Sequence, residues 1–380
     1  MLPTPKKINR VIILFTLILL FFSFGFFAPD FPLNHLTHIN ISLLQFRLPY
    51  SDAFHCLKLN SSNYQNPNTE FGRKHYSYLL NITSPYRWRK RTSSICPDGP
   101  FLENLFIERY LHKPLSYFGI FIPLFVTWHG EAEHSFPRKK RHFYRNIINK
   151  IRQNILPQYI YLVFCECDWG FTFIFGHCPK NVLVISASGE GHLPIPWIQC
   201  NYSYFERLQA SNFMVFQGSE NHTEERVSIL KNVKNVLNDK FIQKPFDSNW
   251  MDFSRKALFG LSPRGVAIST YRTYELIQFG VIPFIVNDGP HWRSFSPRLN
   301  WDLFAFHSNL TELSEKTKAI GSLLHKEIRF MQMNLDYVRK EFFTYEGIFR
   351  EFELFLHNKP SYISCPEDTF INFHHGPKSD

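Results

Sequence analysis

Two arginines and a glutamate in the stretch 257–288 have side chains that suit a phosphorylated sugar ligand. Arg272 and Glu275 stand three residues apart, so they share one face of a helix, and Arg264 lies in the loop before that helix. Guanidinium groups present planar forks of donors to phosphate oxygens, and a carboxylate accepts hydrogen bonds from ribose hydroxyls. The set therefore predicts a nucleotide sugar rather than a bare phosphate. The same spacing is also the pattern of an ordinary surface ion pair.

The elements that must position these side chains are predicted from the same stretch. An apolar run over 257–261 has the length of a strand and ends at a Ser-Pro-Arg-Gly loop. A helix begins at Ser269 or Thr270, either of which can cap it, and Gly280 suits its C-terminal end. The apolar run 281–286 is a second strand. In such units ligands bind where strand ends meet helix N-termini. The candidate donor-binding residues are therefore Ser262, Arg264, Gly265, Arg272, Glu275, Asn287 and Asp288.

Four segments here resemble the donor-site signature of the exostosin-like (GT47-type) glycosyltransferases. They are Pro263-Arg264-Gly265, Arg272-Thr273-Tyr274-Glu275, Gly280-Val281-Ile282-Pro283 and Asn300-Trp301-Asp302-Leu303-Phe304. The resemblance covers about fifty residues. It implies an α/β fold of two Rossmann-like domains in the GT-B arrangement. It also implies an inverting transfer from a UDP- or GDP-linked sugar to a glycan or glycoprotein acceptor.

The chain ahead of this stretch alternates strands with helices, which predicts a mostly parallel α/β sheet. Its turns resemble, more weakly, the N-terminal half of the same family: Asp168-Trp169-Gly170, Ser188-Gly189-Glu190-Gly191 and Pro194-Ile195-Pro196. The resemblance implies that a general base from this half takes the proton of the acceptor hydroxyl. Asp168 and Glu190 are the candidates, followed by Glu131 and His129, because each comes after a strand-like run. Each of these residues also suits a turn or a helix cap.

The N-terminus has the pattern of a membrane anchor. Residues 11–27 carry no charge, and a helix of that length spans about 26 Å, near the lower limit for a bilayer core. Lys6, Lys7 and Arg10 precede this segment, so residues 1–10 should stay cytoplasmic and the rest of the chain should be lumenal. A cleaved signal peptide is the alternative. We expect a single-pass type II membrane protein of the Golgi or the endoplasmic reticulum.

Six Asn-x-Ser/Thr sequons agree with a lumenal chain. They are Asn40, Asn60, Asn81, Asn201, Asn221 and Asn309. Residues 28–80 are rich in Asn, Ser and Pro and are expected to form a stem. We expect an N-terminal, acceptor-side domain over 81–238, a C-terminal nucleotide-sugar-binding domain over 239–356 and a tail over 357–380.

No metal or other cofactor is expected besides the nucleotide-sugar co-substrate. The sequence has no Asp-x-Asp, the motif with which GT-A enzymes hold a divalent metal. The leaving diphosphate would then be stabilised by Arg264, Arg272 and the helix N-terminus. Cys165, Cys167 and Cys178 lack the spacing of common zinc sites, so disulfides or buried thiols are expected there. The chain has seven cysteines, and in an oxidising lumen we expect one to be left over.

Composition excludes some classes of function. The 380 residues are 44% apolar and 17% aromatic, which argues for packed cores and against disorder. The net charge of +10 indicates attraction to anions, but an anchored lumenal chain does not meet nucleic acid. Two other functions stay open, a fucosyltransferase-like enzyme and a non-catalytic lumenal protein that binds glycans or a partner transferase. The donor sugar, the acceptor and the choice between monomer and homo- or hetero-oligomer stay open as well.

Overall fold

The structure of the protein is a computed structural model, and it describes most of the chain from residue 53 onward. The described residues are 53–87, 101–128, 138–167, 170–187, 189–198, 205–220, 223–265, 267–289, 292–296, 298–357, 359, 361 and 363. All of them belong to one unit, Asn40–Asp380. The anchor expected at 11–27 lies outside this part of the chain. Within it, no helix is both long enough and apolar enough to span a bilayer.

The first half of the chain forms a parallel sheet in the order β1-β2-β3-β4. Its strands are β1 (Phe121–Pro123), β2 (Ile160–Cys165), β3 (Val182–Ser186) and β4 (Leu193–Pro194). Every residue of these strands is buried, as is typical of parallel strands covered on both faces. The register pairs Cys165 with Ser186, so the loops after β2 and β3 begin side by side.

Helices complete the first half. They are α3 (Ala53–Leu57), α4 (Glu70–Thr83), α5 (Leu102–Tyr110), α7 (Arg138–Gln153) and α8 (Gly170–Phe175). Ile147, Ile148 and Ile151 are the buried side of α7, as their helical spacing predicts. Because α7 joins β1 to β2 and α8 joins β2 to β3, the three strands form parallel crossover units. Short 3-10 helices lie at Ser61–Asn63, Ser84–Tyr86, Leu115–Phe118, Asn238–Lys240 and Trp301–Leu303.

The second half forms a parallel sheet in the order β6-β5-β7-β8-β9. Its strands are β5 (Asn212–Gln217), β6 (Phe241–Lys244), β7 (Ala257–Pro263), β8 (Ile282–Val286) and β9 (Phe306–Ser308). The chain builds outward in one direction from β5 to β6 and in the other from β7 to β9. The strand order therefore reverses between β5 and β7, which is the place where doubly wound sheets bind their ligands.

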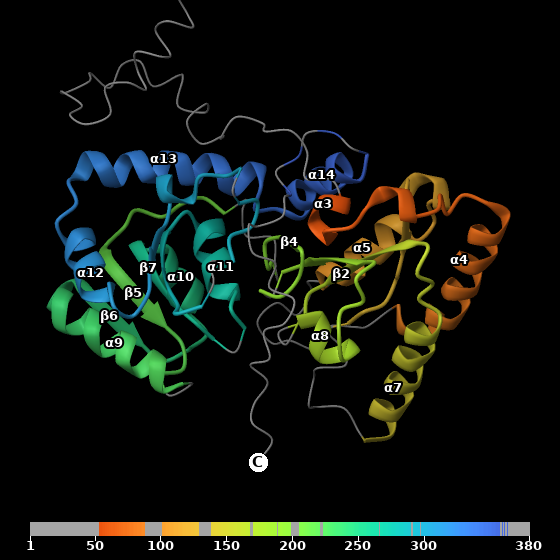
Figure 1. Ribbon diagram of the computed structural model, residues 1–380. Helices are drawn as coiled ribbons and strands as arrows, with labels where there is room; N and C mark the ends of the chain where they lie inside the picture. The colour runs from red at the N-terminus through yellow and green to blue at the C-terminus, as the bar shows by residue number, and fades with distance from the viewer. Residues whose placement is uncertain are drawn as a thin grey trace, which may run out of the picture. The chain divides into compact units, whose positions relative to one another are not determined.

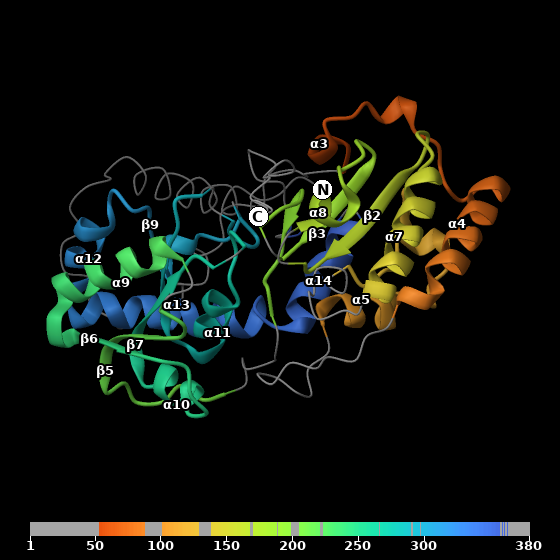
Figure 2. The same ribbon diagram turned by 90° about the horizontal axis from the view of Figure 1, so that it is seen from below.

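Helices cover both faces of the second sheet. They are α9 (Glu224–Leu237), α10 (Trp250–Arg255), α11 (Tyr271–Phe279), α12 (Leu313–Gly321) and α13 (His325–Glu341). Figures 1 and 2 show α9 and α12 on one face and α10 and α11 on the other. Connections on opposite faces are what the reversal of strand order requires.

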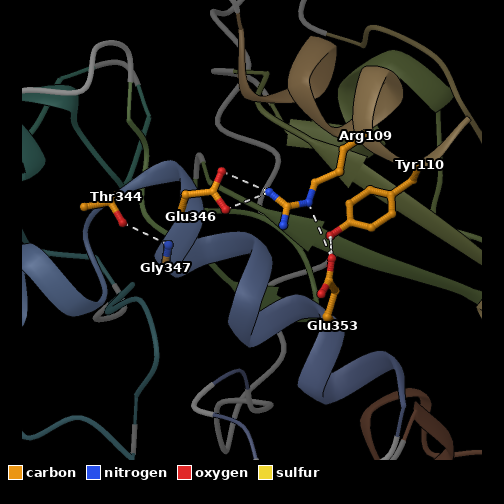
Figure 3. Close-up of polar contacts among 6 residues, drawn as sticks. All are labelled: Arg109, Tyr110, Thr344, Glu346, Gly347 and Glu353. Carbon is orange, nitrogen blue, oxygen red and sulfur yellow. Dashed lines mark hydrogen bonds and ion pairs between the residues drawn. The ribbon is translucent and has the colours of Figure 1, made fainter.

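The last helix, α14 (Tyr345–Leu356), packs against the first half of the chain. Its Phe352 ring lies 5.4 Å from Phe106 of α5, and both rings are buried. Figure 3 shows the polar contacts beside them. Arg109 of α5 donates from Nη1 to both carboxylate oxygens of Glu346 at 3.0 and 2.9 Å, and the Tyr110 hydroxyl donates to Glu353 at 2.8 Å. The C-terminal helix thus ties the second half of the chain to the first.

The change from one sheet to the other comes earlier than we expected. We placed β5 in the domain 81–238, but β5 pairs with β6 and β7, with Met214 opposite both Phe241 and Phe259. The chain therefore passes between the sheets after Pro194 and before Asn212. The runs of β7 and β8 were predicted, whereas the pairing of β5 depends on contacts with residues far along the chain.

Candidate functional site

The strand–loop–helix–strand unit predicted around Arg272 is confirmed. Thr270 caps α11, since its side-chain oxygen accepts from the Arg272 N–H at 3.2 Å. Gly280 ends the helix in the left-handed conformation with φ of 74°, which glycine adopts without a steric penalty. β7 and β8 pair in parallel with Gly260 opposite Pro283. The N-terminus of α11 therefore opens at the carboxyl end of β7.

A pocket of about 210 Å³ lies at this helix N-terminus. Its lining comes from the ends of β5 and β7, from the loop after β6, and from α9 and α11. The lining residues are Phe216, Gln217, Gly218, Arg226, Phe246, Pro263, Thr270, Tyr271, Arg272 and Glu275. The pocket therefore sits where the strand order reverses, lined by the first turn of α11, two arginines and one glutamate.

Arg272 and Glu275 form a pair inside this pocket and not a surface ion pair. Arg272 Nε lies 3.3 Å from Glu275 Oε2, and the two side chains are 17% and 9% exposed. The Arg272 guanidinium also stands 5.3 Å from the centre of the Trp250 ring, a distance typical of a cation–π contact. Carboxylate and ring fix the guanidinium in one orientation at the pocket wall. Of the seven predicted donor residues, these two line the pocket.

Arg226 supplies a second guanidinium group that the sequence analysis missed. It comes from the first turn of α9, and its Nη2 donates to the carbonyl of Arg264 at 3.0 Å. Burial lowers the pKa of Arg226, and the positive charge of Arg272 lowers it further. The two cations therefore repel each other across the pocket, and an anion between them would relieve that repulsion. No local signal marks Arg226, which precedes the motif by 38 residues.

Ser262, Arg264 and Gly265 lie close to the pocket, but they are not among its lining residues. Ser262 is fully buried, and its hydroxyl is bonded to that of Thr273 at 2.8 Å. Its role is therefore to join β7 to α11, which corrects the donor-binding role that we expected. The Arg264 N–H donates to the carbonyl of Val286 at 2.9 Å. Gly265 lies beside the Arg226 guanidinium, which would be 3.5 Å from a Cβ at this position.

Asn287 and Asp288 follow β8 and play different parts. Asp288 accepts from the backbone N–H of Leu310 at 2.7 Å, so its carboxylate holds the turn after β9. Asn287 is 6% exposed, and its side-chain Oδ1 has no hydrogen-bond partner among the described residues. Neither residue lines the pocket at α11. Asn287 therefore keeps a buried polar atom without a partner among the described residues.

The loop after β3 brings Glu190 toward the same region. Gly189 has φ of 109°, and a Cβ there would stand 2.7 Å from Ile268 Cβ, so this loop packs directly against the loop before α11. The Glu190 carboxyl points into the first half, where Thr172 donates to it. Burial raises the pKa of Glu190 to about 8. Glu190 is therefore mostly protonated at neutral pH, and it acts as a base only as the pH approaches that value.

The other predicted residues are placed as follows. Asp168, Glu131 and His129 lie outside the described residues, as do the sequons at Asn40, Asn201 and Asn221. The sequons at Asn60, Asn81 and Asn309 are described.

The cysteines pair less than we expected. Cys56 is disulfide-bonded, whereas Cys165 and Cys178 are free thiols, so the prediction that one cysteine would be left over is wrong. Burial raises the pKa of both free thiols, which keeps them protonated and unreactive. In the described part of the chain no cluster of His, Cys, Asp and Glu could hold a metal ion.

No family model and no curated protein matches this chain. Among solved structures, a glycosyltransferase from Rickettsia africae aligns with 77% of this chain and 83% of its own, at 10% identity and a TM-score of 0.36. TarM from S. aureus, in complex with fondaparinux, alpha-GlcNAc-glycerol and UDP, aligns over 52% of this chain and 55% of its own, at 8% identity and a TM-score of 0.33. This chain thus spans about half the length of TarM. The spinosyn rhamnosyltransferase SpnG, complexed with the spinosyn aglycone, aligns over 81% and 86%, at 9% identity and a TM-score of 0.25.

Proposed function

We propose that this chain is a glycosyltransferase that binds a nucleotide sugar in the pocket at the carboxyl ends of β5 and β7. One observation carries the proposal: Arg226, Arg272, Glu275 and the N-terminus of α11 meet in one pocket at the reversal of strand order. Two cations and a helix N-terminus suit a diphosphate. The carboxylate beside them can accept hydrogen bonds from the ribose hydroxyls. Neither guanidinium can do so, because a guanidinium only donates.

The arrangement supports a direct displacement at the sugar. The acceptor hydroxyl oxygen forms a bond to the anomeric carbon while the bond from that carbon to the diphosphate breaks. The leaving nucleoside diphosphate gains negative charge, which Arg226, Arg272 and the α11 N-terminus stabilise. The acceptor's proton passes to a base from the first half of the chain, for which Glu190 and Asp168 are the candidates. The loop that carries Glu190 packs at Gly189 on the loop before α11.

The finer parts of the proposal rest on the sequence. The spaced Pro-Arg-Gly, Arg-x-x-Glu and Ile-Pro segments support an exostosin-like enzyme that inverts the anomeric centre and uses no metal. The apolar run 11–27 and the sequons support a lumenal catalytic part, anchored in the Golgi or the endoplasmic reticulum. A glycan or glycoprotein acceptor follows from that placement.

Thermal unfolding of the lumenal chain with UDP, GDP, CMP and their sugars tests the donor site. A ligand at a hundred times its Kd adds about 2.7 kcal/mol to the free energy of unfolding. Arg272→Ala should remove most of that gain. Arg255→Ala is the matched control, because Arg255 is 16% exposed, has Asp252 three residues away and stands 5.0 Å from the Phe205 ring centre. It should keep the gain in full.

The results separate the functions that stay open. No stabilisation by any nucleotide in a folded sample would refute the donor site. Stabilisation without sugar transfer to any acceptor would favour the non-catalytic binding protein. If transfer is found, we expect it to persist in EDTA, and a strict need for a divalent metal would overturn the metal-independent mechanism.

A further inference from the structure

The three described sequons differ in how the asparagine meets its Ser or Thr two residues on. At Asn309 the side-chain Oδ1 accepts from the Thr311 hydroxyl at 2.8 Å and from the Glu312 N–H at 2.8 Å. At Asn60 the Oδ1 accepts from the Ser62 hydroxyl at 2.9 Å and from the Ser62 N–H at 3.1 Å. These bonds occupy the amide oxygen and leave the nitrogen, to which a glycan is joined, without a partner among the described residues.

Asn81 has a different arrangement. It lies within α4, and the hydroxyl of its Thr83 is buried and donates back to the carbonyl of Leu79 at 2.8 Å. Asn81 is exposed on the helix, so it opens directly to solvent. Asn60 is also exposed. Asn309 is half-buried and lines a cavity of about 410 Å³, which is within the size range of small-molecule sites, about 300–1,000 Å³.

The lining of this cavity fits a neutral sugar. Its residues are Arg293, Asp302, Ala305, Phe306, His307, Ser308, Asn309, Glu312 and Lys316. Two cations and two carboxylates balance in charge, so the cavity does not favour a charged ligand. Sugar hydroxyls both donate and accept, and these four side chains offer both kinds of partner.

Arg293 points to a missing partner in particular. Its side chain is 23% exposed, and its Nη1 reaches Asp302 Oδ1 only at 3.5 Å, while the Asp302 side chain is 75% exposed. Arg293 Nε is buried and has no hydrogen-bond partner among the described residues. Beyond its long contact with Asp302, the guanidinium has no partner among the described residues, so its terminal nitrogens can donate to a sugar oxygen.

We propose that Asn309 carries an N-linked glycan whose first sugars lie in this cavity, against Arg293, Asp302, Glu312 and Lys316. The occupant is a modification of the chain itself and not a free substrate. The inference rests on the lumenal placement proposed above and is independent of the transfer reaction. The Asn60 glycan, which has no cavity beside it among those described, is the reference within the same molecule.

The test uses the full chain expressed through a eukaryotic secretory pathway. The native protein is treated with a peptide N-glycosidase in heavy-oxygen water, and the conversion of each Asn to labelled Asp is followed by mass spectrometry. Release at Asn309 should be at least about tenfold slower than at Asn60, because the sugars must first break one or two hydrogen bonds. Release from the two sites should be equally fast after denaturation.

Variants connect this protection to the cavity. Arg293→Ala should speed release at Asn309 and leave Asn60 unchanged, and Arg255→Ala should change neither. Lys316→Ala, at an exposed lining position, replaces Arg293→Ala if that variant is secreted poorly.

The outcomes are distinct. Equal native release at both sites, or glycosylation at Asn60 without Asn309, would overturn the inference and leave the lumenal placement standing. No modification at any sequon would overturn both, whereas nucleotide binding would be untouched by either result.

Discussion

The role of Arg226 offers the sharpest test of the donor pocket, because no sequence motif pointed to it. Arg226→Gln removes the charge, and because Gln is two bonds shorter it also loses the donors that reach the carbonyls of Ser219 and Arg264 at 3.1 and 3.0 Å. The free protein also loses the repulsion between Arg226 and Arg272. The loss of two hydrogen bonds is partly offset by this relief, so we expect the free energy of unfolding to fall by at most about 3 kcal/mol.

Binding of a nucleoside diphosphate should also weaken. A hydrogen bond between a guanidinium and a phosphate oxygen contributes about 1.5–3 kcal/mol. Its loss should raise the Kd for the bound nucleoside diphosphate by about 10- to 150-fold. Arg226→Lys should recover part of the affinity, because an ammonium keeps the charge and loses the planar fork.

Isothermal titration with UDP and GDP measures this effect, with uridine and guanosine as controls that lack the diphosphate. The nucleosides should bind the variant and the parent protein equally. High salt should weaken the nucleoside diphosphates more in the parent than in the variant, since the lost interaction is ionic. An unchanged Kd for the nucleoside diphosphate would refute the two-cation pocket, and an equal loss for the nucleoside would show that Arg226 acts only on the fold.

Three further predictions concern the residues around the pocket. Burial raises the pKa of Glu190 from 4.5 to about 8, so the folded protein holds a proton that the unfolded chain releases. Its contribution to the free energy of unfolding should fall as the pH rises between those values. The Tm of the parent protein should therefore decrease over this pH range, and the Tm of Glu190→Gln should not show that decrease. Gly189→Ala places a Cβ 2.7 Å from Ile268 Cβ at φ of 109°. The free energy of unfolding measured in urea should fall by about 1–3 kcal/mol, and sugar transfer should be reduced. Ser262→Ala leaves the buried Thr273 hydroxyl without its 2.8 Å partner. The free energy of unfolding measured in urea should fall by about 1–3 kcal/mol, whereas the Kd for the nucleotide should stay constant.

Local signals sufficed for the frame of the site. Ser269 or Thr270 was predicted to cap α11, because either hydroxyl can reach an N–H of the first turn, and the cap is Thr270. Gly280 was predicted to end the helix because glycine tolerates positive φ. Arg272 and Glu275 were predicted to share a face by their spacing alone, and they do. Each of these features depends on residues within one turn of helix or one tight loop.

Features set by distant contacts could not be predicted in this way. Arg226 reaches the pocket because β5 and β7 are neighbours in the sheet, with Met214 opposite Phe259. That same pairing moved β5 out of the first half, where its place in the chain order had put it. The Ser262 hydroxyl was expected to face a ligand, but the packing of α11 on β7 turns it to Thr273.

The contact at Gly189 allows the position of the loop before α11 and the charge of Glu190 to be changed separately. The loop after β3 meets the loop before α11 through backbone and Cβ atoms, at Ile268 and the Ser269 N–H. The Glu190 carboxyl points the other way, toward Thr172. A change of charge at Glu190 should therefore alter proton transfer without moving the donor loop, whereas Gly189→Ala should move the loop without altering the charge. If both variants lost transfer with the same pH profile, the carboxyl would have no separate part in the chemistry, and the base would have to be sought elsewhere in the first half.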